Sequence, residues 1–97
     1  MFRIYHIYIM TNKTNKVLYI GITSNLQGRV LQHKDKVFLG FTSKYNVNKL
    51  VYFEEFNSPY DAIMREKQLK GGSRVKKIKL VESMNNKWID LSTEWYD

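Results

Sequence analysis

The chain has 97 residues and no cysteine, which predicts one domain with a single core and excludes disulfides and thiolate metal sites. Lys and Arg number 16 against 9 for Asp and Glu, so the net charge is +7, and 14% of the residues are aromatic. Such a composition favours a polyanionic partner, although a lysine-rich soluble domain without one has the same composition. The lack of cysteine fits a cytoplasmic protein, and the N-terminus has no long apolar run, so we expect neither signal peptide nor membrane span.

Two alternating segments open the chain. Residues 3–10 and residues 17–23 each alternate apolar and polar or aromatic side chains, and the polar run TNKTNK lies between them. Because successive side chains of a strand point to opposite faces, the two segments predict a β-hairpin with one aliphatic face. The opposite face carries His6, Tyr8, Tyr19 and Gly21.

The next segments predict a helix, a loop and a third strand. Ser24 is a good N-cap for a helix over residues 25–35, whose apolar positions recur at helical spacing. Residues 36–47 show no periodicity and predict a loop with aromatic anchors. Residues 48–56 contain LVYF, which is apolar on both faces and predicts a central strand.

Two further helices are marked by their caps. Ser58 and Pro59 begin a helix that runs to about residue 70 and ends at two glycines. Ser73 begins another over residues 74–84, with Val75, Ile78 and Val81 as its expected buried stripe. Residues 1–97 therefore predict one α+β domain, a small three-stranded antiparallel sheet flanked by three or more helices.

Glu66 interrupts an apolar helix face. At helical spacing it falls between Ala62, Ile63 and Leu69, whereas Arg65 is expected to point away. A carboxylate in that position costs free energy unless it is paired or binds a metal. An ion pair with a lysine or arginine and a metal site both remain open.

Arg29 and His33 share one side of the first predicted helix, four residues apart. Arginine clamps phosphate well, and an imidazole can relay a proton near neutral pH. A solvated basic helix face is the alternative. Asn85, after the last predicted helix, by itself indicates a helix cap.

A basic run lies between residues 70 and 79, with five positive residues and no acidic one. Together with Lys44 and Tyr45 in the loop, it could follow a phosphate backbone. Each of these residues alone is more often a solvated surface charge. The positive residues of the run are Lys70, Arg74, Lys76, Lys77 and Lys79.

The ordered blocks HIY at 6–8, YIG at 19–21, NLQGRVLQH at 25–33 and AIMREKQLK at 62–70 resemble the GIY-YIG nuclease superfamily. The resemblance covers nearly the whole chain and is strongest to small stand-alone bacterial members described as excinuclease-like. The superfamily includes the nuclease domain of the excision-repair incision protein and certain intron homing endonucleases. The first motif departs from the pattern, because His6 stands where the family has glycine, and puts a bulky side chain beside the expected site.

The resemblance implies a role for each matching residue. It makes Glu66 the ligand of one Mg2+ or Mn2+ ion, which suits a cation that keeps most of its waters. The general base stays open between Tyr8, Tyr19 and His33. The implied catalytic residues are Tyr8, Tyr19, Arg29, His33 and Asn85. Substrate contacts are expected from Gly21, Lys44, Tyr45, Lys70 and Arg74.

The implied reaction is metal-dependent hydrolysis of phosphodiester bonds, in DNA rather than RNA, with a link to DNA repair. We expect a cytoplasmic monomer or weak dimer with no membrane partner. A nucleic-acid-binding module that has lost catalysis is the main alternative, and a protein–protein module is a third. The complete set of Tyr8, Tyr19, Arg29, His33 and Glu66 argues against lost catalysis.

Overall fold

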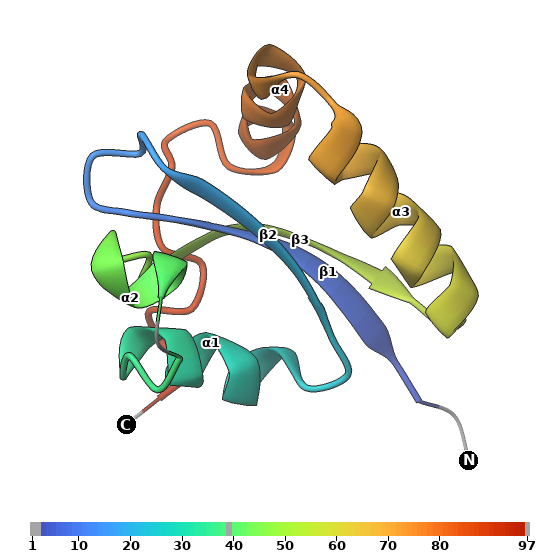
Figure 1. The fold of residues 1–97 in the computed structure, drawn as a ribbon, viewed down its shortest axis with the longest axis horizontal. Helices are drawn as coiled ribbons and strands as arrows, with labels where there is room; N and C mark the ends of the chain where they lie inside the picture. Colours follow the sequence, from blue (N-terminus) through green and yellow to red (C-terminus); the bar gives the residue numbers. More distant parts are fainter. Residues whose placement is uncertain (1–2, 39, 97) are drawn as a thin grey trace.

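The computed structural model describes residues 3–38 and 40–96 and contains a three-stranded sheet between two layers of helices (Figure 1). In chain order the elements are β1 (Tyr5–Thr11), β2 (Leu18–Thr23), α1 (Leu26–Lys34), α2 (Phe41–Lys44), β3 (Lys49–Phe56), α3 (Pro59–Gly71) and α4 (Arg74–Met84). The α+β architecture expected from the sequence is confirmed. None of the helices in the described ranges is long and apolar enough to cross a membrane.

The strand order is β2-β1-β3, and both pairings are antiparallel. The prediction that residues 48–56 form the central strand is wrong, because β1 holds that place. The outer edge of β3 is covered by the C-terminal segment: the amide of Leu91 donates to the carbonyl of Leu50 at 2.8 Å, and the amide of Leu50 donates to Asp90 at 3.2 Å. This cover, with helices on both faces, explains why an edge strand is so apolar.

Each face of the sheet has its own core, so the single core expected from the chain length is wrong. In Figure 1, α3 and α4 lie over one face, and α1 and α2 lie under the other. The first core contains Ile7, Ile9, Ile20, Val51, Tyr52, Leu69 and Val81. The second contains Tyr8, Met10, Leu26, Val30, Val47 and Leu50. The aromatic face of the hairpin therefore lies on the side of α1.

Three local expectations need correction. The N-cap of α1 is Asn25 rather than Ser24, because the Asn25 side chain accepts the amide of Gly28 at 3.1 Å. The segment expected as a loop contains the short helix α2. Val75 is 60% exposed, so the expected buried stripe of α4 holds for Val81 but not for Val75.

The other two helix starts agree with their sequence signals. Ser58 accepts the amide of Asp61 at 3.3 Å, and Ser73 accepts the amide of Lys76 at 3.2 Å. A serine that satisfies an amide in the first turn stabilises the helix. The cap at Ser58 fixes the start of α3, the helix that carries Glu66.

Candidate active site

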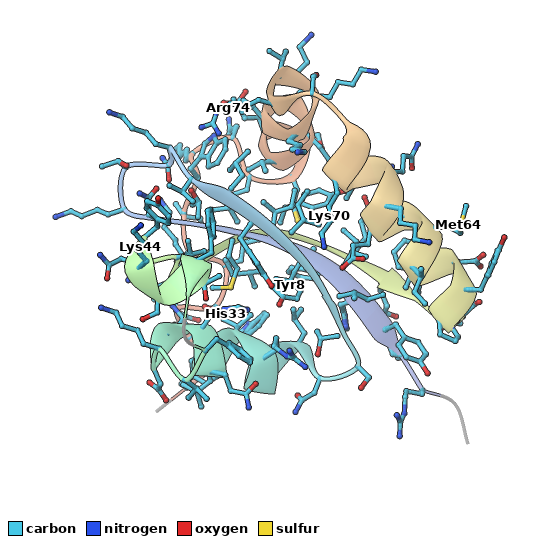
Figure 2. All side chains as sticks on the ribbon, in the orientation of Figure 1. Tyr8, His33, Lys44, Met64, Lys70 and Arg74 are labelled. Carbon is cyan, nitrogen blue, oxygen red and sulfur yellow. The ribbon has the colours of Figure 1, made fainter. Side chains whose placement is uncertain are left out.

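A buried pair, Tyr8 on β1 and His33 on α1, lies at the centre of the aromatic face. The Tyr8 hydroxyl and Nε2 of His33 share a hydrogen bond of 3.0 Å, and only 1% of Tyr8 and 4% of His33 is exposed. Figure 2 labels both residues, between β1 and α1. Tyr8 is placed there by its register with Gly21 on β2, whose missing side chain leaves room for the tyrosine ring.

Tyr19 and Arg29 adjoin the Tyr8–His33 pair. The Tyr19 ring meets the His33 ring edge-on, with centroids 5.2 Å apart. The Arg29 guanidinium carbon lies 5.3 Å from the centroid of Phe38, a cation–π distance, and Phe38 in turn contacts His33 at 4.8 Å between centroids. The four predicted residues Tyr8, Tyr19, Arg29 and His33 therefore form one group, which we call the tyrosine–histidine cluster.

Burial keeps both members of the central pair uncharged near neutral pH. Burial lowers the pKa of His33, and the positive charge of Arg29 lowers it further. Burial raises the pKa of Tyr8 well above its usual value, with Tyr19 and Glu66 adding to the rise and Arg29 opposing it. A neutral imidazole bonded to a protonated phenol can accept or pass on a proton.

Glu66 lies on α3, in the helical layer on the other side of the sheet from α1. Its negative charge acts on the Tyr8 hydroxyl, although it is the smallest of the influences on the pKa of Tyr8. Its side chain is 17% exposed and lies 3.5 Å from Nζ of Lys70, one helical turn on. The structure thus contains the ion pair that the sequence left open as an alternative to a metal site.

A single carboxylate such as Glu66 suits a cation that keeps most of its waters. Over residues 3–38 and 40–96, no three His, Cys, Asp or Glu side chains gather as a metal-binding group. Mg2+ needs only one or two carboxylates, because waters and substrate phosphate complete its shell. Glu66 is the carboxylate that would hold it, and Lys70, which is 56% exposed, can move away.

Asn85 is not brought into the cluster. Its side-chain amide donates to the carbonyls of Val51 at 3.2 Å and Ile89 at 2.7 Å, and its oxygen accepts the amide of Ile89 at 3.0 Å. These side-chain bonds fix the loop after α4 against β3, across the sheet from β2, whereas the helix is capped by the Asn85 backbone amide, which donates to the carbonyl of Val81 at 2.8 Å. The hydrogen bonds match the helix-cap interpretation of Asn85.

The expected substrate contacts are spread over three elements. Lys44 and Tyr45 lie at the end of α2, where Nζ of Lys44 is 5.4 Å from the Tyr45 ring centroid. Lys70 lies beside Glu66, whereas Arg74 at the start of α4 donates to the carbonyl of Lys16 at 2.5 Å. Arg74 therefore ties α4 to the β1–β2 loop, a contact with no local sequence signal.

His6 lies on the same face of β1 as Tyr8, two residues earlier. Its ring meets Phe53 edge-on with centroids 5.9 Å apart, and its Nε2 is 3.8 Å from a carboxylate oxygen of Glu55. Both His6 and Phe53 line an open groove of about 820 Å3 that reaches the first residues of α1. The side chain that replaces the motif glycine thus lines this groove.

Arg65 differs from its expected orientation. Its guanidinium forms a two-point contact with Glu54 on β3, at 2.9 Å from Nε and 2.8 Å from Nη2, and Tyr52 donates to the same carboxylate. The prediction that Arg65 points away is wrong, because its guanidinium reaches Glu54 on the sheet. An arginine on a helix gives no sequence signal for a partner eleven residues earlier on a strand.

Comparison with known sequences settles the family. The family model described as GIY-YIG catalytic domain matches residues 4–79. The chain belongs to the GIY-YIG family. A UPF0213 protein of Staphylococcus haemolyticus is 35% identical over 78 residues, covering 80% of this chain and 94% of that protein. A UPF0213 protein of Clostridium perfringens is 34% identical over 82 residues, covering 84% and 87%.

A solved structure agrees with this GIY-YIG fold. The solution NMR structure of a UPF0213 protein from Bacillus halodurans has a TM-score of 0.58 and 24% identity, and it covers 94% of this chain and 97% of that chain. At that identity the likeness shows the fold alone. Membership of the GIY-YIG family supports a nuclease-type function and nucleic-acid binding for this chain.

Proposed function

We propose that this GIY-YIG protein is a nuclease that hydrolyses phosphodiester bonds with the help of one divalent cation. The observation that carries the proposal is the buried Tyr8–His33 hydrogen bond, with Arg29 close enough for its charge to lower the pKa of His33. Arg29 binds the scissile phosphate and stabilises the negative charge that grows there. A net charge of +7 supports a polyanionic substrate.

The Tyr8–His33 pair moves the proton. Nε2 of the neutral His33 takes the Tyr8 proton in the same step in which the Tyr8 oxygen takes a proton from the attacking water, so that no free tyrosinate has to form. Tyr19 orients that water. A Mg2+ or Mn2+ ion held at Glu66 would stabilise the charge on the leaving oxygen.

Lys44 and Tyr45 at the end of α2, Lys70 on α3 and Arg74 on α4 are proposed to contact the substrate around this centre. Gly21 is proposed to act there through Tyr8, for whose ring it makes room. We further propose DNA rather than RNA as the substrate, a cytoplasmic monomer or weak dimer, and a role in DNA repair. The resemblance to the excision-repair incision domain supports the DNA substrate and the role in repair.

A cleavage assay tests the proposed function. The wild-type protein is incubated with labelled single-stranded, duplex and flap DNA and with RNA, in Mg2+, in Mn2+ and in EDTA. We expect cleavage in either metal and none in EDTA. Glu66→Gln should abolish cleavage and keep binding, whereas Asp61→Asn, which changes an exposed carboxylate of the same helix, should leave cleavage intact.

Other outcomes would point elsewhere. Metal-dependent cleavage that survives Glu66→Gln would overturn the assigned metal ligand. A salt-sensitive gel shift without cleavage under any condition would favour a nucleic-acid-binding module. Neither cleavage nor a shift would favour a protein–protein module.

A further inference from the structure

Tyr19 of the tyrosine–histidine cluster is followed by two further aromatic rings, which lie on and just after α2. The Tyr19 and Phe41 rings are nearly parallel, at 29° with centroids 6.5 Å apart, and the Phe41 and Tyr45 rings are 4.9 Å apart. Phe41 is 50% exposed and Tyr45 is 41% exposed. We call Tyr19, Phe41 and Tyr45 the aromatic row.

The aromatic row is fixed to the core. Thr42 and Val47 beside it are buried, and the amide of Val47 donates to the carbonyl of Thr42 at 2.9 Å. The amide of Tyr45 donates to the carbonyl of Phe41 at 3.0 Å, which holds the two exposed residues in one turn. Because α2 buries its smaller residues and presents its larger rings to solvent, the rings are available to a partner.

The charge around the aromatic row favours a polyanion. Nζ of Lys44 lies 5.4 Å from the Tyr45 ring, and residues 36–48 contain no acidic residue. At the other end, Tyr19 contacts His33, which lies close to Arg29. Figure 2 shows Lys44 on α2, on the same side of the sheet as His33 on α1. The aromatic row is thus partly exposed and has a positive group at each end. Proteins that bind single-stranded nucleic acid combine aromatic rings and positive groups in this way.

We propose that the aromatic row stacks an unpaired nucleobase of the substrate while Arg29 holds the neighbouring phosphate. This inference rests on the proposed nuclease function and names its substrate class: a nucleic acid with an unpaired nucleotide beside the cleaved bond. A base inside a duplex is stacked on its neighbours and cannot offer its face to Phe41. Lys44 holds the next phosphate along the strand.

The test separates stacking from general electrostatic binding. Fluorescence anisotropy in EDTA gives the Kd of a labelled single strand and of the duplex of the same sequence, for the wild type, Phe41→Leu and Tyr45→Leu. Leucine keeps apolar volume but removes the ring face. We expect Phe41→Leu to raise the Kd of the single strand about tenfold, since stacking contributes on that order per base, and to leave the Kd of the duplex unchanged.

Tyr60→Leu is the matched control, because Tyr60 is 68% exposed on α3 and lies outside the aromatic row. It should change neither Kd. In Mg2+, wild-type cleavage should be faster on the single strand than on the duplex, and Phe41→Leu should reduce that difference. Circular dichroism confirms that each variant is folded.

The outcomes distinguish this inference from the proposed function. Equal losses on single strand and duplex, or no loss on either, would overturn the aromatic row and leave a cleaving enzyme intact. Single-strand binding that depends on Phe41, with no cleavage in any metal, would support the row and overturn the nuclease. Absence of all nucleic-acid binding would overturn both.

Discussion

The ring of Tyr8 lies across the backbone of Gly21, its partner on the neighbouring strand. A Cβ at position 21 would lie 2.3 Å from both Cζ and the hydroxyl oxygen of Tyr8, far inside van der Waals contact. The glycine of the second motif therefore makes room for the tyrosine of the first. Without that room the Tyr8 hydroxyl would not reach His33, so the two motifs act as one structural unit.

Gly21→Ala should disrupt this contact. The added methyl group must displace the Tyr8 ring, and overpacking of a core costs about 1–3 kcal/mol of unfolding free energy. Because the hydroxyl moves away from His33, cleavage should fall even where the variant is folded. Urea denaturation and a cleavage assay below the unfolding transition measure the two effects.

Gly71→Ala is the control for that change. A Cβ at Gly71, at the end of α3, meets no atom within 4 Å, so stability should be unchanged or rise by a few tenths of a kcal/mol. Wild-type stability and cleavage in Gly21→Ala would show that the close contact with Tyr8 does not position the hydroxyl.

Tyr8→Phe and Tyr52→Phe each remove one hydroxyl from a buried ring. Tyr8→Phe leaves Nε2 of His33 buried without its partner, which should cost about 1–3 kcal/mol of stability. It also removes the proposed proton path, so cleavage should fall about 100-fold or more. In Tyr52→Phe, Glu54 keeps its contact with Arg65, and cleavage should be unchanged. Equal cleavage by the two variants would exclude the Tyr8 hydroxyl from the reaction.

Local rules predicted the parts of the fold whose causes are local. Alternation along the hairpin placed Tyr8 and Tyr19 on one face, and the N-cap serines Ser58 and Ser73 placed the starts of α3 and α4. The place of β3 at the edge depends on Asp90, some forty residues later, which accepts the amide of Leu50. No periodicity within β3 could reveal that partner.

The candidate site divides in the same way. Motif order indicated Tyr8, Tyr19, Arg29 and His33, which the structure brings together. No sequence motif indicated Phe41, because its proposed role in stacking depends on Tyr19 and Tyr45, whose rings adjoin it only after folding. The environment of Arg65 likewise depends on Glu54 across the α3–β3 contact. Sequence patterns predict which residue types are available, and tertiary contacts decide their neighbours.

The two histidines should make the fold less stable as the pH falls below about 6.5, their usual pKa. Burial lowers the pKa of both His6 and His33 in the folded protein. As the pH falls, the unfolded chain therefore protonates its histidines before the folded protein does, which favours unfolding. This part of the stability is fully present above about pH 6.5 and is lost as the pH falls through the folded pKa values. Urea denaturation between about pH 8 and about pH 5 measures the loss.

His33→Gln should reduce that pH dependence, because it removes one of the two histidines whose pKa is lowered by folding. The carboxylates act in a lower range: burial opposes the ionisation of Glu54, but hydrogen bonds from Arg65 and Tyr52 outweigh it and hold the pKa of Glu54 below its usual 4.5. Stability from Glu54 is therefore present above that value and is lost below it. A flat profile through the histidine range would contradict the lowered pKa values.

Asn85 allows the cap interpretation to be tested against the catalytic role implied by the family resemblance. Asn85→Ala removes three hydrogen bonds to buried or half-buried backbone and should lower the unfolding free energy by about 1–3 kcal/mol. Cleavage per folded molecule should stay unchanged, because the amide is fixed on the β3 side of the sheet. Asn86→Ala, at the exposed next residue, should alter neither quantity. If a folded Asn85→Ala variant no longer cleaves, Asn85 takes part in the reaction. Its bonds to Val51 and Ile89 would then have to break when substrate binds.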